Sequence, residues 1–488
     1  MQAFLAPLTE LADYQEILRN RRRGEGFIQV AGCVNSQKTH LMYAIGDGCE
    51  YRVIAFSSEE KAKKAYEEYR FLTEDVYVYP ARDLLFYHAD IKGKLLTDRR
   101  MEVLRTLIEK EPEKQITIIT TIDAFLDGLP EPERLKGQRI RVSGGDTVDF
   151  SEFQSRLAAL GYERESQIEG PGQFAVRGGI LDVFPLTEEM PVRIELWGDE
   201  IDSIRSFDVE SQRSVENLTE VTIYPAVENW EEGAETVSFL EYFPREKSLL
   251  LLDEPARLQE KAEEVEEEYL GSMESRTEAG MEDEDDLRVF PVKEIIEKMN
   301  HYCGFGFTTL ESRCGAFHVR ETYSIQTKGV NPYNSSFELL TRDLKRLKRN
   351  GWRVILLSGS RTRAKRLAED LRDYDLSSFY SEDMERRVNP GEIMVAYGYV
   401  AEGYEYPMLK FTVISESDIF GKKKKKKKRR RTYEGQKIQD FAELKPGDYV
   451  VHENHGLGIY QGIEKVEVDK VTKDYMKISY ADGGILYI

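Results

Sequence analysis

Residues 32–39 have the types and spacing of a phosphate-binding loop, with one exception. In a loop of the form G-x-x-x-x-G-K-[ST], backbone N–H groups wrap the phosphates, the lysine reaches the outer phosphates and the hydroxyl group holds Mg²⁺. Gly32, Lys38 and Thr39 occupy their expected positions. Gln37, however, stands where the second glycine is needed, and a side chain there disfavours both the backbone conformation and the close approach to phosphate. The sequence therefore predicts a nucleotide fold whose binding site is vestigial.

An acidic pair could supply the metal-binding half of the same chemistry. Four leucines in the predicted strand at 248–254 lead into Asp253 and Glu254, which is the pattern of a Walker B strand that places a carboxylate on Mg²⁺. Any buried parallel strand that ends at a helix N-terminus reads the same way, because acidic residues complement the helix dipole there. No Ser–His–Asp or Cys–His grouping has a recognisable signature. We therefore predict no catalytic residue in this chain.

Four residues of zinc-ligand type lie within eighteen positions, namely His301, Cys303, Cys314 and His318. A single residue separates His301 from Cys303. In an extended strand, both side chains would point to the same face, and they would not form the tight turn that C-x₂-C supplies. Small buried cysteines explain the pattern better. We expect the cysteines of the chain to be free thiols, and we predict no metal site.

Alternating strand and helix patterns surround the phosphate loop. Short β-branched and aromatic runs at 52–56, 76–79 and 115–120 alternate with charged segments of helical periodicity at 59–71 and 97–110. This order predicts a parallel sheet flanked by helices.

The pattern as a whole predicts an α/β protein of several domains. Gly-punctuated strands with one helix follow the first parallel sheet, and strand–helix–strand order then returns. This second strand–helix–strand unit resembles the second half of a helicase motor. It lacks a Gln and Arg pair spaced as an arginine finger and its sensor, so we predict that it is non-catalytic. The expected units are a degenerate nucleotide-fold domain at 1–127 plus 224–252, an inserted α+β domain at 128–223, the remainder of the first module with an acidic stretch at 253–316, a small α/β domain at 317–418, a polybasic linker at 419–443 and a small β-barrel at 444–488.

Composition limits the class of protein. The chain has 488 residues and a net charge of −20, and it contains neither an export signal nor a run of about 18 apolar residues. We therefore expect a cytoplasmic protein without a membrane partner. The ten consecutive lysines and arginines at 422–431 fit a nuclear-localisation or heparin-like segment as well as a tether for DNA or RNA phosphates. Because the rest of the chain is strongly acidic, we expect only weak DNA contact.

Two blocks of sequence carry a family resemblance. Residues 447–462 follow the pattern G-D-Y-V-V-H-x-x-H-G-x-G-x-Y-x-G, which resembles the RNA-polymerase-interacting domain of bacterial transcription-repair coupling factors, a domain shared with CarD-like regulators. Residues 80–87 and 172–185 look like the UvrB-homology module of the same family. The resemblance covers essentially the whole chain. It implies a degenerate RecA-like parallel-sheet domain at the start and a partial SH3/Tudor-like β-barrel at the end.

The resemblance implies an adapter that links stalled RNA polymerase on damaged DNA to UvrA-dependent nucleotide excision repair. It maps a UvrA contact to Arg164, Phe174 and Arg177, while a third basic position of the UvrB pattern is Ala175 in this chain. We expect Arg164 and Arg177 to lie on one exposed face of the insert, where they can form charge-assisted hydrogen bonds with an acidic partner.

The same resemblance maps a contact with the polymerase β subunit to Lys465, Val466 and Glu467. Segment 463–468 alternates apolar and charged residues, as in a strand with one face on a barrel core, and the edge of such a strand can pair with another chain. The alternation alone also allows Val466 to pack inside while Glu467 faces water. The chain stops at residue 488, inside the expected barrel.

Members of this family continue into an ATP-driven DNA translocase, which would lie beyond residue 488. The resemblance therefore implies that ATP and Mg²⁺ serve that motor, and that this chain has no cofactor and no enzymatic activity of its own. Two other readings remain open. One is an active UvrB-like ATPase or helicase, which would need an intact phosphate loop, and the other is a CarD-like transcription regulator with an unrelated N-terminus.

Overall fold

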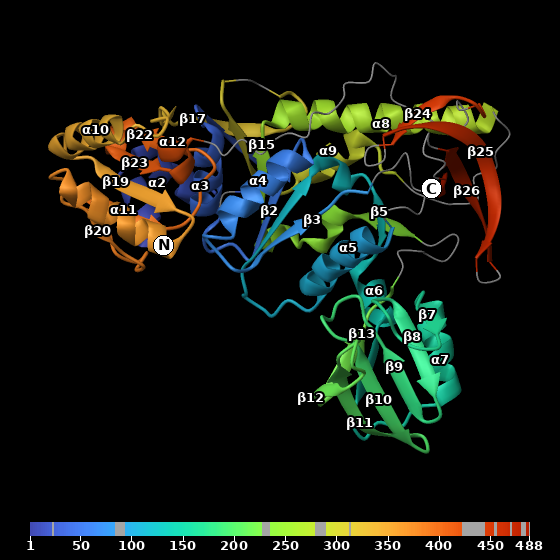
Figure 1. Cartoon of the computed structure of the whole chain (residues 1–488). Coiled ribbons are helices and arrows are strands. Elements are labelled where there is room, and N and C mark those ends of the chain that lie inside the picture. Colours follow the sequence, from blue (N-terminus) through green and yellow to red (C-terminus); the bar gives the residue numbers. More distant parts are fainter. Residues whose placement is uncertain are drawn as a thin grey trace.

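The computed structural model describes the chain except for residues 22–23, 83–92, 227–234, 279–288, 312–313, 422–444, 453–455, 469–470, 480–484 and 488. The polybasic run at 422–431 thus lies outside the described residues. Figure 1 shows a central domain, an inserted domain below it, a second α/β domain on one side and a β-sheet on the other. None of the helices in the described part combines the length and apolar character that a bilayer span requires.

The central domain is built on a seven-stranded sheet in which every neighbouring pair is parallel. Its strands, in spatial order, are β17 (Val319–Ser324), β1 (Gly26–Ala31), β16 (Cys303–Thr308), β15 (Ser248–Asp253), β2 (Tyr51–Phe56), β4 (Ile116–Thr121) and β3 (Val76–Tyr79). β1, β4 and β15 are buried along their whole length, as expected for a parallel sheet that carries helices on both faces. The strands predicted at 52–56, 76–79 and 115–120 are confirmed.

Helices cover both faces of this sheet. One face packs against α1 (Gln2–Leu8), α2 (Ala12–Asn20), α3 (Asn35–Gly46) and α4 (Glu59–Tyr69). The other packs against α5 (Gly93–Ile108), α8 (Pro255–Glu278), α9 (Val292–Asn300) and the short 3₁₀ helices Ile122–Phe125 and Phe239–Tyr242. A further 3₁₀ turn, Arg245–Lys247, leads into β15.

Two predicted domain boundaries change. β17 belongs to the central sheet, although it falls in the segment assigned to the small α/β domain at 317–418. Its residues are mostly polar and exposed, so its sequence lacks the apolar run that marks the buried strands. β5 (Gly128–Pro130) pairs with β14 (Thr236–Ser238) and places Leu129 in the core of the central domain, so the insert begins after residue 130.

The insert is an α+β domain, as predicted. Its main sheet has the order β12 (Ser214–Leu218), β11 (Glu200–Phe207), β10 (Val192–Trp197), β9 (Ile180–Val183), β8 (Gln173–Arg177) and β7 (Glu163–Glu165). All pairs are antiparallel except β7 and β8. The other elements are α6 (Pro132–Gln138), α7 (Phe150–Ala159), and the paired strands β6 (Ile140–Ser143) and β13 (Glu220–Ile223).

The second α/β domain is a six-stranded sheet with two long helices on one face. The strands, in spatial order, are β18 (Lys328–Gly329), β22 (Tyr404–Tyr406), β23 (Phe411–Ile414), β19 (Arg353–Ser358), β21 (Ile393–Tyr397) and β20 (Phe379–Tyr380). Leucines of α10 (Phe337–Arg349) and α11 (Arg361–Asp373) pack on one face. The other face joins the core that contains α1 and α3. A 3₁₀ turn (Pro407–Leu409) and α12 (Glu416–Phe420) complete the domain.

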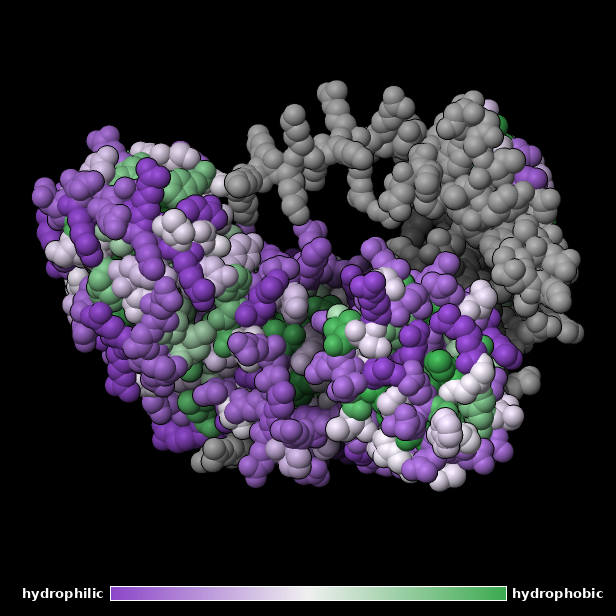
Figure 2. Space-filling view, turned by 60° about the horizontal axis from the view of Figure 1, so that its bottom comes forward, coloured by the Kyte–Doolittle hydropathy of each residue, from purple (hydrophilic) through white to green (hydrophobic). Residues whose placement is uncertain are grey.

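The C-terminal residues form a four-stranded antiparallel sheet with the order β24 (Tyr449–His452), β25 (Gly456–Val468), β26 (Val471–Ser479) and β27 (Ile485–Tyr487). Closure of these strands into an SH3/Tudor-like barrel stays a prediction. The face of the molecule in Figure 2 is largely hydrophilic, with small scattered apolar groups, as is usual for a protein surface.

Candidate functional site

Residues 32–39, the predicted phosphate loop, connect β1 to α3. Gly32 has a φ of 81°, and a Cβ there would lie 2.5 Å from the carbonyl oxygen of Ile325, so only glycine fits. Helix α3 begins at Asn35, and Gln37 caps its first turn. The Oε1 atom of Gln37 accepts a hydrogen bond of 3.1 Å from the Val34 N–H. Gln37 thus occupies a loop N–H group that an anion would otherwise use.

Lys38 lies in the first turn of α3 and is paired with the acidic end of β15. Its Nζ atom lies 2.7 Å from Asp253 Oδ1 and 2.6 Å from Glu254 Oε1, and its side chain is only 10% exposed. Lys61 Nζ lies 2.9 Å from Asp253 Oδ2. Burial by itself raises the pKa of Glu254, but hydrogen bonds from Lys38 and Thr309 hold it below its usual value. The phosphate-binding and metal-binding halves of the motif therefore neutralise each other.

The hydroxyl groups of the loop are also used within the protein. Ser36 and Thr39 hydrogen-bond the carboxyl group of Glu68 on α4, and the N–H of Ala401 donates to the same group at 3.0 Å. Burial raises the pKa of Glu68, and these hydrogen bonds offset only part of that effect. Thr39, which in a working loop would hold Mg²⁺, instead contacts a buried carboxyl group.

The second α/β domain covers the loop with the segment that leads into β22. The N–H of Glu402 donates to Ser36 Oγ at 3.1 Å, and its carboxylate accepts a hydrogen bond from Asn35. Gln37 Nε2 donates to the hydroxyl oxygen of Tyr406 at 3.0 Å. A phosphate bound by this loop would have to displace the segment, so the site is filled by a domain interface.

His40 extends this interface into the core. Its Nε2 lies 3.2 Å from the Phe4 carbonyl oxygen, which can only accept, so Nε2 carries the proton. Its Nδ1, 2.9 Å away, then accepts from the Tyr406 hydroxyl, whose oxygen in turn accepts from Gln37. Burial lowers the pKa of His40 to about 4, so the ring is neutral at pH 7.

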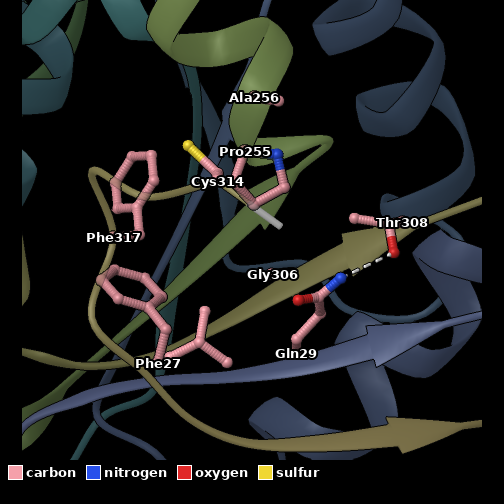
Figure 3. Close-up of a pocket in the computed structure, with 9 residues that line it drawn as sticks. Phe27, Gln29, Pro255, Ala256, Gly306, Thr308, Cys314 and Phe317 are labelled. Atoms are coloured by element: carbon pink, nitrogen blue, oxygen red, sulfur yellow. Dashed lines mark hydrogen bonds between the residues drawn. The ribbon is translucent and has the colours of Figure 1, made fainter. Parts of the chain in front are cut away.

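A small cavity lies beside the same sheet, between β1, β16 and the start of α8 (Figure 3). Gln29 Nε2 donates to Thr308 Oγ1 at 3.4 Å on one side of it. On the other side, Cys314 Sγ donates to Gln259 Oε1 at 3.2 Å. Its volume of about 10 Å³ holds one water molecule at most, so it admits no cofactor.

The residues of zinc-ligand type do not converge. His301 lies 3.1 Å from a carboxylate oxygen of Glu25, and the thiol of Cys303 donates to the carbonyl oxygen of Arg21 at 2.9 Å. Within the described ranges, no group of three or more His, Cys, Asp or Glu side chains could hold a metal ion. His301 and Cys303 therefore have ordinary structural partners.

The three residues predicted to contact UvrA lie in different settings. Arg164 is on β7, an exposed edge strand, and Arg177, at the end of β8, has a side chain that is 48% exposed. Phe174 is 2% exposed and packs in the core of the insert, so it supports the strand and cannot contact a partner directly. The register pairs Arg164 with Phe174, so Arg164 and Arg177 lie on opposite faces of the sheet and not on one face as expected.

Lys465, Val466 and Glu467, the predicted polymerase contacts, lie on β25, where the register pairs them with residues 472–474 of β26. β24 pairs only with the first four residues of β25. Among the described residues, the other edge of β25 around Val466 therefore has no strand partner. Such an edge is suited to strand addition by a second protein.

Sequence reasoning missed two residues that organise these sites. Tyr406 is distant in sequence from the loop that it covers, and nothing local signals that contact. Asp182 is 1% exposed and binds Arg177 and Arg193. It stands within the otherwise apolar run at 180–184, and an acidic residue in such a run is a signal that could have been used, because a buried carboxylate requires partners.

Two family models match the chain. The UvrB interaction domain matches residues 140–228, which form most of the insert. The CarD-like/TRCF RID domain matches residues 444–488, which include the C-terminal sheet.

Curated relatives extend this similarity over nearly the whole chain. The transcription-repair-coupling factor of Bacillus subtilis (strain 168) is 27% identical over 99% of this chain and 46% of its own length. That of Staphylococcus haemolyticus is 27% identical, with 85% and 40% covered, and that of Staphylococcus aureus (strain MRSA252) is 26% identical, with 85% and 40% covered. The chain thus spans less than half the length of these relatives. In its two matched domains and over nearly its whole length, the chain is thus similar to the transcription-repair-coupling factors.

Proposed function

We propose that this chain is an adapter that joins RNA polymerase to UvrA-dependent nucleotide excision repair. The observation that carries the proposal is the presence of a UvrB interaction domain and a CarD-like/TRCF RID domain in one chain. The relatives share the name transcription-repair-coupling factor, which supports the proposal. The acidic chain would act in the cytoplasm, and weak DNA contact through residues 422–431 remains a prediction.

The filled phosphate loop favours an adapter over a UvrB-like ATPase. A nucleotide would have to break the contacts of Lys38 with Asp253 and Glu254 and displace the segment around Glu402. Asp253 would keep Lys61, but Glu254 would lose its lysine, and a partly buried carboxylate that loses its cation opposes nucleotide binding. The proposal therefore gives this chain neither a nucleotide cofactor nor a catalytic residue.

The insert supplies the proposed UvrA contact through Arg177. This arginine is half-exposed, and a charge-assisted hydrogen bond from it to an acidic partner contributes roughly 1.5–3 kcal/mol. Arg164, on the other face of the sheet, is a second candidate for the UvrA contact. The charge-reversal experiment below distinguishes Arg164 from Arg177.

The C-terminal sheet supplies the proposed contact with the polymerase β subunit. Residues 465–467 lie on β25 at an edge that β24 leaves open among the described residues. Main-chain hydrogen bonds to an incoming strand would provide affinity, and the side chains of β25 would provide specificity.

A bridging experiment tests the adapter. A fragment of the polymerase β subunit is immobilised, and retention of purified UvrA is measured with and without the chain. We expect UvrA to be retained only when the chain is present. Deletion of residues 444–488 should abolish capture of the chain by the polymerase fragment while leaving its binding to UvrA intact.

Charge reversal separates the two arginines. Arg177→Glu should abolish UvrA retention without changing polymerase binding, and Arg164→Glu is compared in the same assay. If the unchanged chain retains no UvrA, or if UvrA binds the polymerase fragment equally well without it, the adapter proposal is wrong.

A further inference from the structure

Asp182 is a buried carboxylate that binds two arginines on one face of the insert's sheet. It lies on β9 and is 1% exposed. Its Oδ1 accepts from Arg193 Nε at 2.7 Å, and its Oδ2 accepts from Arg193 Nη2 and from Arg177 Nη2, both at 2.9 Å. Its neighbour on β8 is Ala175, whose small side chain leaves the carboxylate to these two arginines. A buried carboxylate needs such partners.

The two arginines differ in how many of their N–H groups are available to bind a partner. Arg193 is committed to the fold, because Nε and Nη2 bind Asp182, Nη1 donates to the Gln212 carbonyl oxygen at 3.4 Å, and the guanidinium group lies 4.5 Å from the centre of the Phe207 ring. Its side chain is only 16% exposed. It therefore has little capacity to bind a partner.

Arg177, by contrast, has Asp182 as its one side-chain partner among the described residues. One of its five N–H groups binds Asp182, and its side chain is 48% exposed. Its backbone is fixed as well, since it pairs with Ile180 across a two-residue turn in which Gly178 has a φ of 61°. The backbone position is therefore fixed, and the bond to Asp182 restricts the direction of the guanidinium group, before any partner arrives.

We propose that Asp182 is a positioning residue that holds Arg177 in the orientation in which its remaining N–H groups meet a carboxylate on UvrA. The inference rests on the proposed function. A planar guanidinium group binds a carboxylate through two parallel hydrogen bonds only when it is correctly turned. Fixing it beforehand removes the entropic cost of ordering a long side chain on binding.

A purely structural Asp182 would neutralise Arg193 and nothing more. It would affect UvrA binding, if at all, to the same degree whether or not Arg177 is present. A positioning residue acts through Arg177, so its effect disappears when Arg177 is removed. A double-mutant cycle measures this difference.

The experiment uses the full chain and purified UvrA, with dissociation constants for the unchanged chain, Asp182→Asn, Arg177→Ala and the double variant. We expect each single variant to bind about tenfold more weakly, and the double variant to bind as Arg177→Ala does, within about twofold. Glu195→Gln is the matched control, because Glu195 on β10 forms an ion pair with Arg205 on β11 of the same sheet. It should leave the affinity unchanged.

Arg177→Lys provides a second test for the case in which Asp182→Asn lowers the stability of the insert. Lysine keeps the charge at an exposed position but lacks the planar fork, so we expect about the same tenfold loss with an unchanged melting temperature. Equal binding by Arg177→Lys and the unchanged chain overturns the inference, as does an Asp182→Asn effect that persists in the Arg177→Ala background. If the unchanged chain does not bind UvrA at all, the proposed function itself falls, and the inference falls with it.

Discussion

Three neighbouring residues of the phosphate loop use their side chains in contacts inside the protein, and these contacts compete with nucleotide binding. Gln37 caps its own helix, Lys38 binds Asp253 and Glu254, and Thr39 binds a buried carboxyl group. A single substitution therefore cannot restore the site, because the lysine remains neutralised and the covering segment remains in place.

The first prediction concerns this loop. The chain should show no binding of Mg-ATP in the low micromolar range by isothermal titration calorimetry. Gln37→Gly should not create binding, because it leaves the contacts of Lys38 with both acids intact. A low-micromolar dissociation constant for the unchanged chain, tightened by Gln37→Gly, would contradict this prediction and revive the ATPase alternative.

The second prediction is a pH dependence that arises from His40. Its pKa is 6.5 when unperturbed and about 4 in the folded protein, so between these values the unfolded chain binds a proton that the folded chain does not. Stability should therefore fall as the pH is lowered through this window, by about 2 kcal/mol between pH 7 and pH 5. Urea unfolding at pH 7 and pH 5 measures the loss, which His40→Gln should reduce.

His301 provides the control for this experiment. Its side chain is 49% exposed and pairs with Glu25 at the surface, so His301→Gln should leave the pH dependence nearly unchanged. An equal pH dependence in His40→Gln and the unchanged chain would show that other groups dominate.

At the scale of elements, α3 and β25 carry the two most consequential arrangements. All but the first residue of α3 are buried, because the helix lies between the central sheet and the sheet of the second α/β domain. An α-helix that is buried on every side has no solvent face on which to present a ligand site. β25, in contrast, extends past β24 and leaves an edge without a strand partner among the described residues.

The third prediction concerns β25. Val466→Arg should abolish binding of the chain to the polymerase β-subunit fragment, because a charge at the centre of the added-strand contact would be buried without a partner. Binding is measured by surface plasmon resonance and folding by the melting temperature. Gln461→Arg, at an exposed position of the same strand, is the control. Loss of fold in Val466→Arg would instead mean that Val466 belongs to a core.

At the scale of the whole molecule, the central domain and the second α/β domain share one core, which runs from the central sheet through α3 to β22 and β23. Polar groups fix their mutual position, since Tyr406 joins both Gln37 and His40. A core with satisfied polar groups of this kind specifies one arrangement of the two domains.

The fourth prediction tests this coupling. Tyr406→Phe removes a hydroxyl group and leaves buried polar atoms of Gln37 and His40 unpaired, at a cost of about 2 kcal/mol. Hydrogen exchange should become faster in α3 and β22 and stay unchanged in the insert. Tyr374→Phe, at a tyrosine that is 46% exposed, should change neither. Unaltered exchange in α3 would show that apolar packing alone holds the domains together.

Features that depend on neighbouring residues could be predicted before the structure was known. The run of buried strands, the insert and the damaged loop follow from local pattern, because apolar periodicity and a missing glycine act within a few residues. What fills the loop could not be predicted in this way, since Tyr406 and Gln37 meet across 369 positions. The tertiary structure also showed that β17 joins the central sheet and that Arg164 and Arg177 face opposite ways. Register and domain packing depend on contacts between distant segments, and no local pattern encodes them.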